Sequence, residues 1–75
     1  MTNTPSRETI KRLKKEYPAE TKVILDYMDD AQAPPVGTKG TVRLVDDIGS
    51  IHVSWENGSS LAVAYGEDRC HKVTE

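Results

Sequence analysis

The segment Ser50–Tyr65, with the sequence SIHVSWENGSSLAVAY, decides the fold of this chain. Its two alternating apolar stretches are joined by Asn57-Gly58, and an Asn-Gly pair in this setting is the strongest short-range signal for a β-hairpin. Because the chain has 75 residues, it has room for one hydrophobic core. The segment therefore predicts a single, mainly β domain.

The apolar residues on either side of the turn also predict its geometry. A two-residue turn would divide these residues between both faces of the hairpin and would weaken the core. A three-residue loop, Glu56–Gly58, with its glycine in the left-handed conformation, shifts the register by one. Val53 then pairs with Leu61 and Ile51 with Val63, all on the inner face. We therefore predict the bulged, three-residue loop.

A helix is expected near the N-terminus, over residues 6–17. Thr4 or Ser6 can cap it, and Pro18 ends it because the residue before a proline avoids helical geometry. The helix is expected to lie against the domain without forming its centre, because its apolar stripe is narrow. Residues 1–5 are expected to be disordered. The stripe consists of Ile10, Leu13 and Tyr17.

Residues 21–74 predict the other strands of a small sheet, because apolar and polar residues alternate along much of this region. In the second strand, Val42 and Leu44 are expected to point inward. One helical turn is expected at Gly66–Arg69, before a last short strand. A long loop, a short loop, a tight hairpin and a single turn, in this order, are typical of an SH3-like barrel. We therefore predict a mainly β fold, a small five-stranded SH3-like barrel with one N-terminal α-helix, forming a single domain over residues 6–75.

The composition places no part of the chain in a membrane. No apolar run approaches the ~18 residues that cross a bilayer. The first residues, MTNTPSR, lack the apolar stretch of a secretory signal. Cys70 is the single cysteine, which excludes an intrachain disulfide. We expect a cytoplasmic protein without membrane contact.

The net charge of −2 conceals an asymmetry between the helix and the sheet. From Arg7 to Lys22 there are six basic and three acidic residues, which gives +3. From Val23 to Glu75 there are four basic and nine acidic residues, which gives −5. A basic helix on an acidic body is most simply a solvated helix attracted to its own domain.

Three segments carry a resemblance to a known family: RETIKRLKKEYP, MDDAQAPPVGTKGTV and VDDIGSIHVSWENGSSLAVAYGED. Together they resemble the bacterial and phage-borne domain-of-unknown-function family numbered 4314, from about Arg7 to Val73. There is a looser likeness in TKGTVRLVDD, which is similar to a strand of KOW-type modules, and in VSWENGSS, which is similar to the Mib/Herc2 peptide-binding domains. The resemblance implies a fold and an origin in prophages and conjugative elements. It implies no catalytic residue.

Side chains able to support catalysis or bind a metal are few and poorly placed. Cys70 and His71 are neighbours, so on a strand they point to opposite faces and do not form a nucleophile–base pair. Cys70 is expected to pack as a small apolar residue, and His52 to be a solvated residue on the outer face of its strand. No cysteine–histidine spacing fits a zinc site, which takes about four ligands. We expect no enzyme activity, no metal and no cofactor.

Adjacent carboxylates in two predicted loops indicate a possible binding rim. In an SH3-like barrel these loops are expected at one end, where aromatic side chains, with Met28 and Pro34, would line a groove or cover the open end. The simpler interpretation of the aspartates is turn chemistry, since their side chains accept bonds from nearby amides. The functional one is an acidic rim that receives Lys or Arg from a protein partner. The predicted partner-binding residues are Tyr27, Asp29, Asp30, Pro35, Asp46, Asp47 and Tyr65.

These observations predict a non-catalytic module that binds a protein through this rim. The alternative is association with nucleic acid, in which the basic helix contacts phosphates, although no aromatic stacking pair accompanies the helix. A further alternative, from the family context, is inhibition of a host defence protein by the acidic barrel. The candidate nucleic-acid-binding residues are Arg7, Lys11, Lys14 and Lys15.

Overall fold

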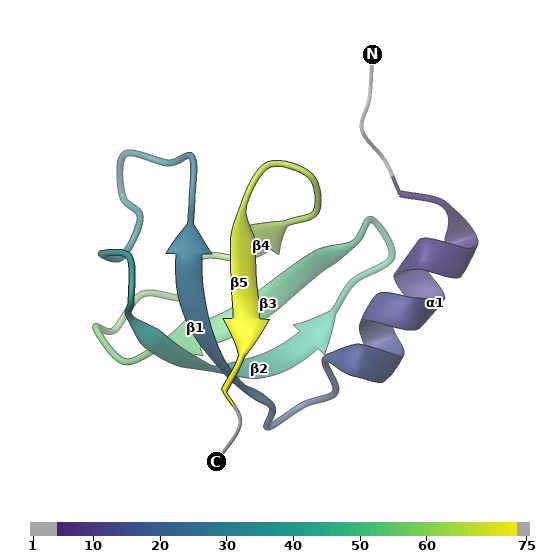
Figure 1. The fold of residues 1–75 in the computed structure, drawn as a ribbon, viewed down its shortest axis with the longest axis horizontal. Helices are drawn as coiled ribbons and strands as arrows, with labels where there is room; N and C mark the ends of the chain where they lie inside the picture. The colour runs from purple at the N-terminus through teal and green to yellow at the C-terminus, as the bar shows by residue number, and fades with distance from the viewer. Residues whose placement is uncertain (1–4, 74–75) are drawn as a thin grey trace.

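The computed structural model describes residues 5–73 and has one helix followed by five strands in a single antiparallel sheet. The strand order is β4-β3-β2-β1-β5, so the last strand returns beside the first (Figure 1). This confirms the predicted mainly β fold with five strands and one N-terminal helix. Disorder is predicted for residues 1–5, and of these only Pro5 is among the described residues. Residue 74, the last of the predicted barrel, also lies outside the described residues. The elements are α1 (Arg7–Glu16), β1 (Lys22–Tyr27), β2 (Lys39–Val45), β3 (Ser50–Trp55), β4 (Val63–Ala64) and β5 (Arg69–Lys72).

Helix α1 begins and ends where its capping residues require. The Ser6 hydroxyl accepts a hydrogen bond from the Thr9 amide at 3.2 Å, which satisfies a backbone donor of the first turn. At the other end, the Tyr17 amide donates to the Leu13 carbonyl at 2.8 Å, and Pro18 follows. Leu13 is buried against the sheet, so the helix lies on the domain and contributes one residue to its core.

The β3–β4 turn has the predicted three-residue geometry. Gly58 is left-handed, with φ of +92°, and its amide donates to the Trp55 carbonyl at 3.0 Å. The Trp55 amide donates to the Ser59 carbonyl at 2.9 Å, which closes the loop. Ile51 pairs with Val63, and this is the register that places the apolar residues on one face.

Strand β4 is shorter than the sequence indicates, because the backbone groups of Leu61 form hydrogen bonds with side chains and not with β3. The Trp55 indole donates to the Leu61 carbonyl at 2.8 Å, and the Ser59 hydroxyl accepts from the Leu61 amide at 3.3 Å. Residues 59–62 therefore leave the ladder, although Leu61 still packs against the core. Pairing resumes at Val63.

A β-bulge in β2 contradicts the inward direction predicted for Leu44. Val42 pairs with Val53, but the next pair joins Leu44 to His52, so Arg43 is an extra residue in its strand. Leu44 consequently faces outward and is 51% exposed, and Val45 takes the inner position.

A second register shift occurs in β1, between Leu25 and Tyr27. Beyond it Tyr27 faces solvent, with 49% of its surface exposed, and Met28 is buried in the core. Pro34 in the following loop is buried as well. Met28 and Pro34 are therefore packed inside the domain, and neither is among the residues that line the groove described below.

The core lies inside the curved sheet, where Val23, Leu25, Val42 and Val53 are fully buried. Gly40 in β2 lies close against β3, as shown by the 2.4 Å that would separate a Cβ at this position from Val53 Cγ1. No helix within residues 5–73 is long and apolar enough to cross a membrane.

The segment before β5 is a turn and not the helical turn predicted for Gly66–Arg69. Gly66 has φ of +87°, which is outside the helical region, and Arg69 already belongs to the strand. The amides of Glu67 and Asp68 both donate to the Ala64 carbonyl, at 3.1 and 2.9 Å. This compact β4–β5 loop positions the groove described next.

Candidate functional site

An open groove of about 420 Å³ lies where α1 faces strands β4 and β5. Its apolar surface comes from elements far apart in the sequence, because the helix, the sheet and the β4–β5 loop each supply residues to it. Two carboxylates and one guanidinium lie among these apolar side chains. The lining residues used below are Leu13, Ile51, Val63, Tyr65, Asp68 and Cys70.

Tyr65 is the exposed aromatic side chain of this groove, with 43% of its surface accessible. It directly follows β4, and a Cβ placed on Gly49 would lie 3.6 Å from its own Cβ. Tyr65 therefore stands between the groove and the β2–β3 turn. It was the one residue of the predicted rim that the structure places in the groove.

Asp68 fixes the end of the groove by joining two loops. One carboxylate oxygen accepts from the Asp29 amide at 2.9 Å, and the other accepts from the Ala64 amide at 2.9 Å. This bond joins the start of the β1–β2 loop to the β4–β5 loop, and both loops lie at the same end of the sheet (Figure 1). Sequence reasoning missed Asp68, since nothing in its local sequence indicates a partner 39 positions away.

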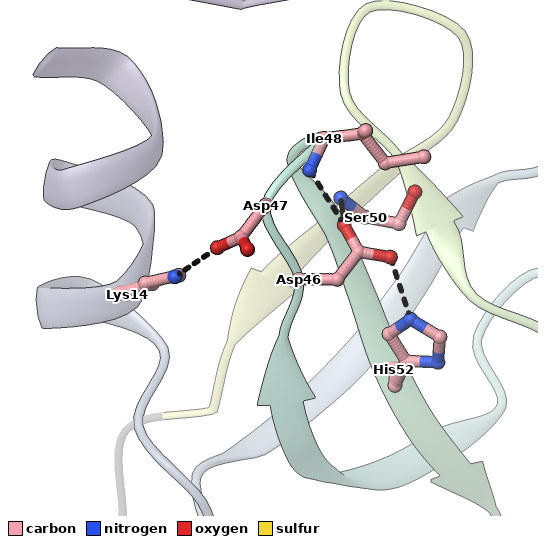
Figure 2. Close-up of polar contacts among 6 residues, drawn as sticks. All are labelled: Lys14, Asp46, Asp47, Ile48, Ser50 and His52. Carbon is pink, nitrogen blue, oxygen red and sulfur yellow. Dashed lines mark hydrogen bonds and ion pairs between the residues drawn. The ribbon is translucent and has the colours of Figure 1, made fainter. Parts of the chain in front are cut away.

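The carboxylate of Asp46 is used inside the β2–β3 turn. It accepts from the amides of Ile48 and Ser50 and lies 2.8 Å from His52 Nε2 (Figure 2). Partial burial raises the pKa of Asp46, but the bonds from His52, Ser50 and Ile48 bring it below its ordinary value. This is the turn chemistry that was the simpler interpretation.

Asp47 forms an ion pair with Lys14 of α1, at 2.7 Å (Figure 2). The pair links the turn to the helix, but both side chains are exposed, so it contributes little stability. Asp46 and Asp47 thus lie beside α1 and are bonded within the domain.

The other predicted rim residues lie at or after the end of β1. Tyr27, Asp29 and Pro35 are exposed. The Asp30 carboxylate accepts from the Gln32 amide at 2.7 Å, which is again turn chemistry. Asp29 adjoins the groove through the bond from its amide to Asp68, and none of these four residues lines the groove.

Cys70 and His71 point to opposite sides of β5, as predicted. His71 Nδ1 donates to the Asp26 carboxylate at 2.8 Å on the exposed side. Cys70 faces the groove and packs against the core. Burial, with a smaller contribution from Asp26, raises the pKa of the Cys70 thiol to about 11, so the thiol is not a reactive thiolate near neutral pH.

Three basic residues of α1 lie around a second hollow, of about 320 Å³. Arg7, Lys11 and Lys14 share one side of the helix and line this hollow with Ile10. Asp47 also lines it, and its carboxylate partly neutralises the cluster. Lys15 is exposed elsewhere and does not line the hollow.

Comparisons with known proteins identify a family but no activity. No curated protein and no solved structure shows significant similarity to the chain. One family model, described as a domain of unknown function (DUF4314), matches residues 6–73. Because the match spans nearly the whole chain, the protein belongs to the DUF4314 family.

Proposed function

We propose that the protein is a non-catalytic module that binds a short segment of another protein in the groove between α1, β4 and β5. The observation that carries the proposal is the groove itself. It has an apolar floor formed by Leu13, Ile51 and Val63, and Tyr65 is exposed at its margin. Exposed aromatic side chains around an apolar depression are typical of protein interfaces.

The charge around the groove indicates which segments would bind. Asp68 lies at one end, joined to the Asp29 backbone, and Asp30 and Glu67 are exposed on the two loops that this bond connects. Four carboxylates therefore belong to the same pair of loops, next to an apolar depression. We expect a segment with an apolar side chain for the groove and a Lys or Arg for the acidic loops.

A peptide-display selection tests this proposal. A random library of short linear peptides is selected against the purified protein, and the affinities of enriched peptides are then measured for two tyrosine variants. Tyr65→Ala should lose about tenfold or more in affinity, because it removes an interfacial aromatic anchor. Tyr27→Ala is the matched control, since Tyr27 is similarly exposed but does not line the groove.

Two results would overturn the proposal. The first is a selection without any enriched peptide. The second is an enriched peptide that is insensitive to Tyr65→Ala, and a loss confined to Tyr27→Ala would move the site to the rim of the β1–β2 loop. A requirement for Lys or Arg in the enriched peptides would support the role of the acidic loops.

A second candidate function is nucleic-acid binding by α1, favoured by the placement of Arg7, Lys11 and Lys14 around one hollow. When a protein contacts phosphates, the logarithm of its binding constant falls linearly with the logarithm of the salt concentration. The slope is about −0.9 per contact on duplex DNA. Titration of duplex DNA at two salt concentrations, with Lys11→Gln as the variant, tests it. Unmeasurable binding at low salt excludes this function.

A further inference from the structure

The outer edge of β5 offers unpaired backbone groups beside the groove. The Val73 amide donates to the Lys22 carbonyl at 2.9 Å, and the register pairs Val23 with Lys72. In an antiparallel ladder, residues alternate between bonding the neighbouring strand and pointing away from it. The N–H and C=O groups of Lys72 and Cys70 therefore point away from β1. No hydrogen bond to them is found within residues 5–73.

The opposite edge of the groove, in β4, is closed by its own loop. The outward-facing amide of Ala64 donates to Asp68, and its carbonyl accepts from the amides of Glu67 and Asp68. An incoming strand would find these groups already bonded. The two edge strands that flank the groove thus differ, because β4 is satisfied and β5 is open.

We propose that the bound protein segment is extended and adds to β5 as a further strand, with backbone bonds to Cys70 and Lys72 and an apolar side chain in the groove. This inference rests on the proposed function and specifies its mode of recognition. Main-chain bonds along a free edge supply affinity in such complexes, and a pocket beside the edge supplies specificity.

The occupant is a different protein and not a second copy of this chain. If β5 paired antiparallel with β5 of a second copy, Cys70 or Lys72 of one copy would lie opposite Cys70 or Lys72 of the other. These two residues carry the backbone groups that point outward. These registers set Arg69 opposite His71, His71 opposite His71, or Lys72 opposite Lys72. None of them forms an opposite-charge pair within β5, and the last places like charges directly opposite, which destabilises a strand pair. The sequence of β5 therefore disfavours a homodimer through this edge.

A proline substitution isolates the backbone contribution. Lys72→Pro removes an outward amide without removing a bond to β1, and proline is tolerated at such edge positions. Lys72→Ala is the matched control, because it removes the same side chain and keeps the amide. Both variants lose the contact in which Lys72 Nζ lies 5.7 Å from the centre of the Tyr17 ring. For an enriched peptide, Lys72→Pro should bind about tenfold more weakly than Lys72→Ala, at similar thermal stability.

Amide hydrogen exchange on the wild-type protein gives an independent measurement that does not depend on the folding of a variant. In the free protein, the amides of Cys70 and Lys72 should exchange fast, and those of His71 and Val73 slowly. Addition of a saturating enriched peptide should slow exchange at Cys70 and Lys72.

The outcomes separate this inference from the function on which it rests. A peptide that requires Tyr65, yet binds the proline and alanine variants equally and leaves exchange at Cys70 and Lys72 unchanged, overturns strand addition and leaves the binding function standing. The absence of any enriched peptide overturns both. A shift of the free protein to a dimer that protects the same amides would also refute the choice of occupant.

Discussion

Substitution of Gly40 by alanine tests how closely β2 and β3 pack over the core. A Cβ at this position would lie 2.4 Å from Val53 Cγ1 and 2.7 Å from Trp55 Cε3. Ordinary contacts are 3.4–4 Å, so the two side chains must move by about 1 Å. Val53 and Trp55 are 1% and 3% exposed, so both side chains would have to move within the core.

The expected loss of stability follows from these contacts. Overpacking of a filled core costs about 1–3 kcal/mol, and a contact this short belongs near the upper end. The lower entropy of the unfolded alanine chain returns up to about 1 kcal/mol, which leaves a net loss of about 2 kcal/mol. For a domain of this size that loss lowers the melting temperature by roughly 8–16 °C, which calorimetry or circular dichroism can measure.

Gly58→Ala is the control for backbone strain without crowding. Gly58 is left-handed but has nothing within 4 Å of an added Cβ, so about 1 kcal/mol and roughly half the shift are expected. In a double-mutant cycle, Val53→Ala should relieve part of the Gly40→Ala penalty, because it removes the nearest atom. A Gly40→Ala protein as stable as the wild type, or a cycle with no coupling, would refute the packing argument.

Two further predictions concern titratable groups. The pKa of Asp46 is lowered in the folded protein, so this residue contributes stability above its ordinary pKa of 3.8, and the contribution is lost as pH falls through the folded value. Asp46→Asn should therefore flatten the acid limb of stability against pH in denaturant titrations below about pH 4, and an unchanged limb would contradict the bonding in the β2–β3 turn. The pKa of Cys70 is raised from 9.0 to about 11, so alkylation of this thiol by iodoacetamide at mildly alkaline pH should be about a hundredfold slower in the native protein than in denaturant. Equal rates would show that the thiol is not buried and that its pKa is not raised.

The parts of the fold that the sequence predicts are those determined by neighbouring residues. The Asn57-Gly58 pair and the alternation around it are sufficient for the hairpin register, since a shift of one residue would reverse every side chain. Ser6 and Pro18 similarly mark the helix ends through local bonding and local sterics.

The two β-bulges could not be predicted in the same way. The sequence Val42-Arg43-Leu44 alternates regularly and favours a regular strand, yet Val45 is apolar too, and Leu44 and Val45 cannot both face inward. Which of these neighbours is buried depends on the curvature of the whole sheet. The pair Leu44-Val45 was the available signal for an irregularity.

The groove itself depends on contacts between distant parts of the chain. Leu13 reaches it from the helix, Val63 from β4 and Cys70 from β5. Asp68 joins backbone groups 39 and 4 positions away, and neither spacing follows from a local pattern. Tyr65 could be found because it follows a predicted strand, where aromatic side chains at the end of a small barrel reach the surface.

The bulge at Arg43 has a consequence for how the length of this chain can vary. Because Arg43 is the residue without a counterpart in β3, the positions before and after it keep their own partners, Val42 with Val53 and Val45 with Ile51. Deletion of this single residue would leave a regular ladder with the same side chains facing the core. Strand β2 can therefore lose this one residue from its middle without a change of fold, a tolerance to deletion that is otherwise found in surface loops.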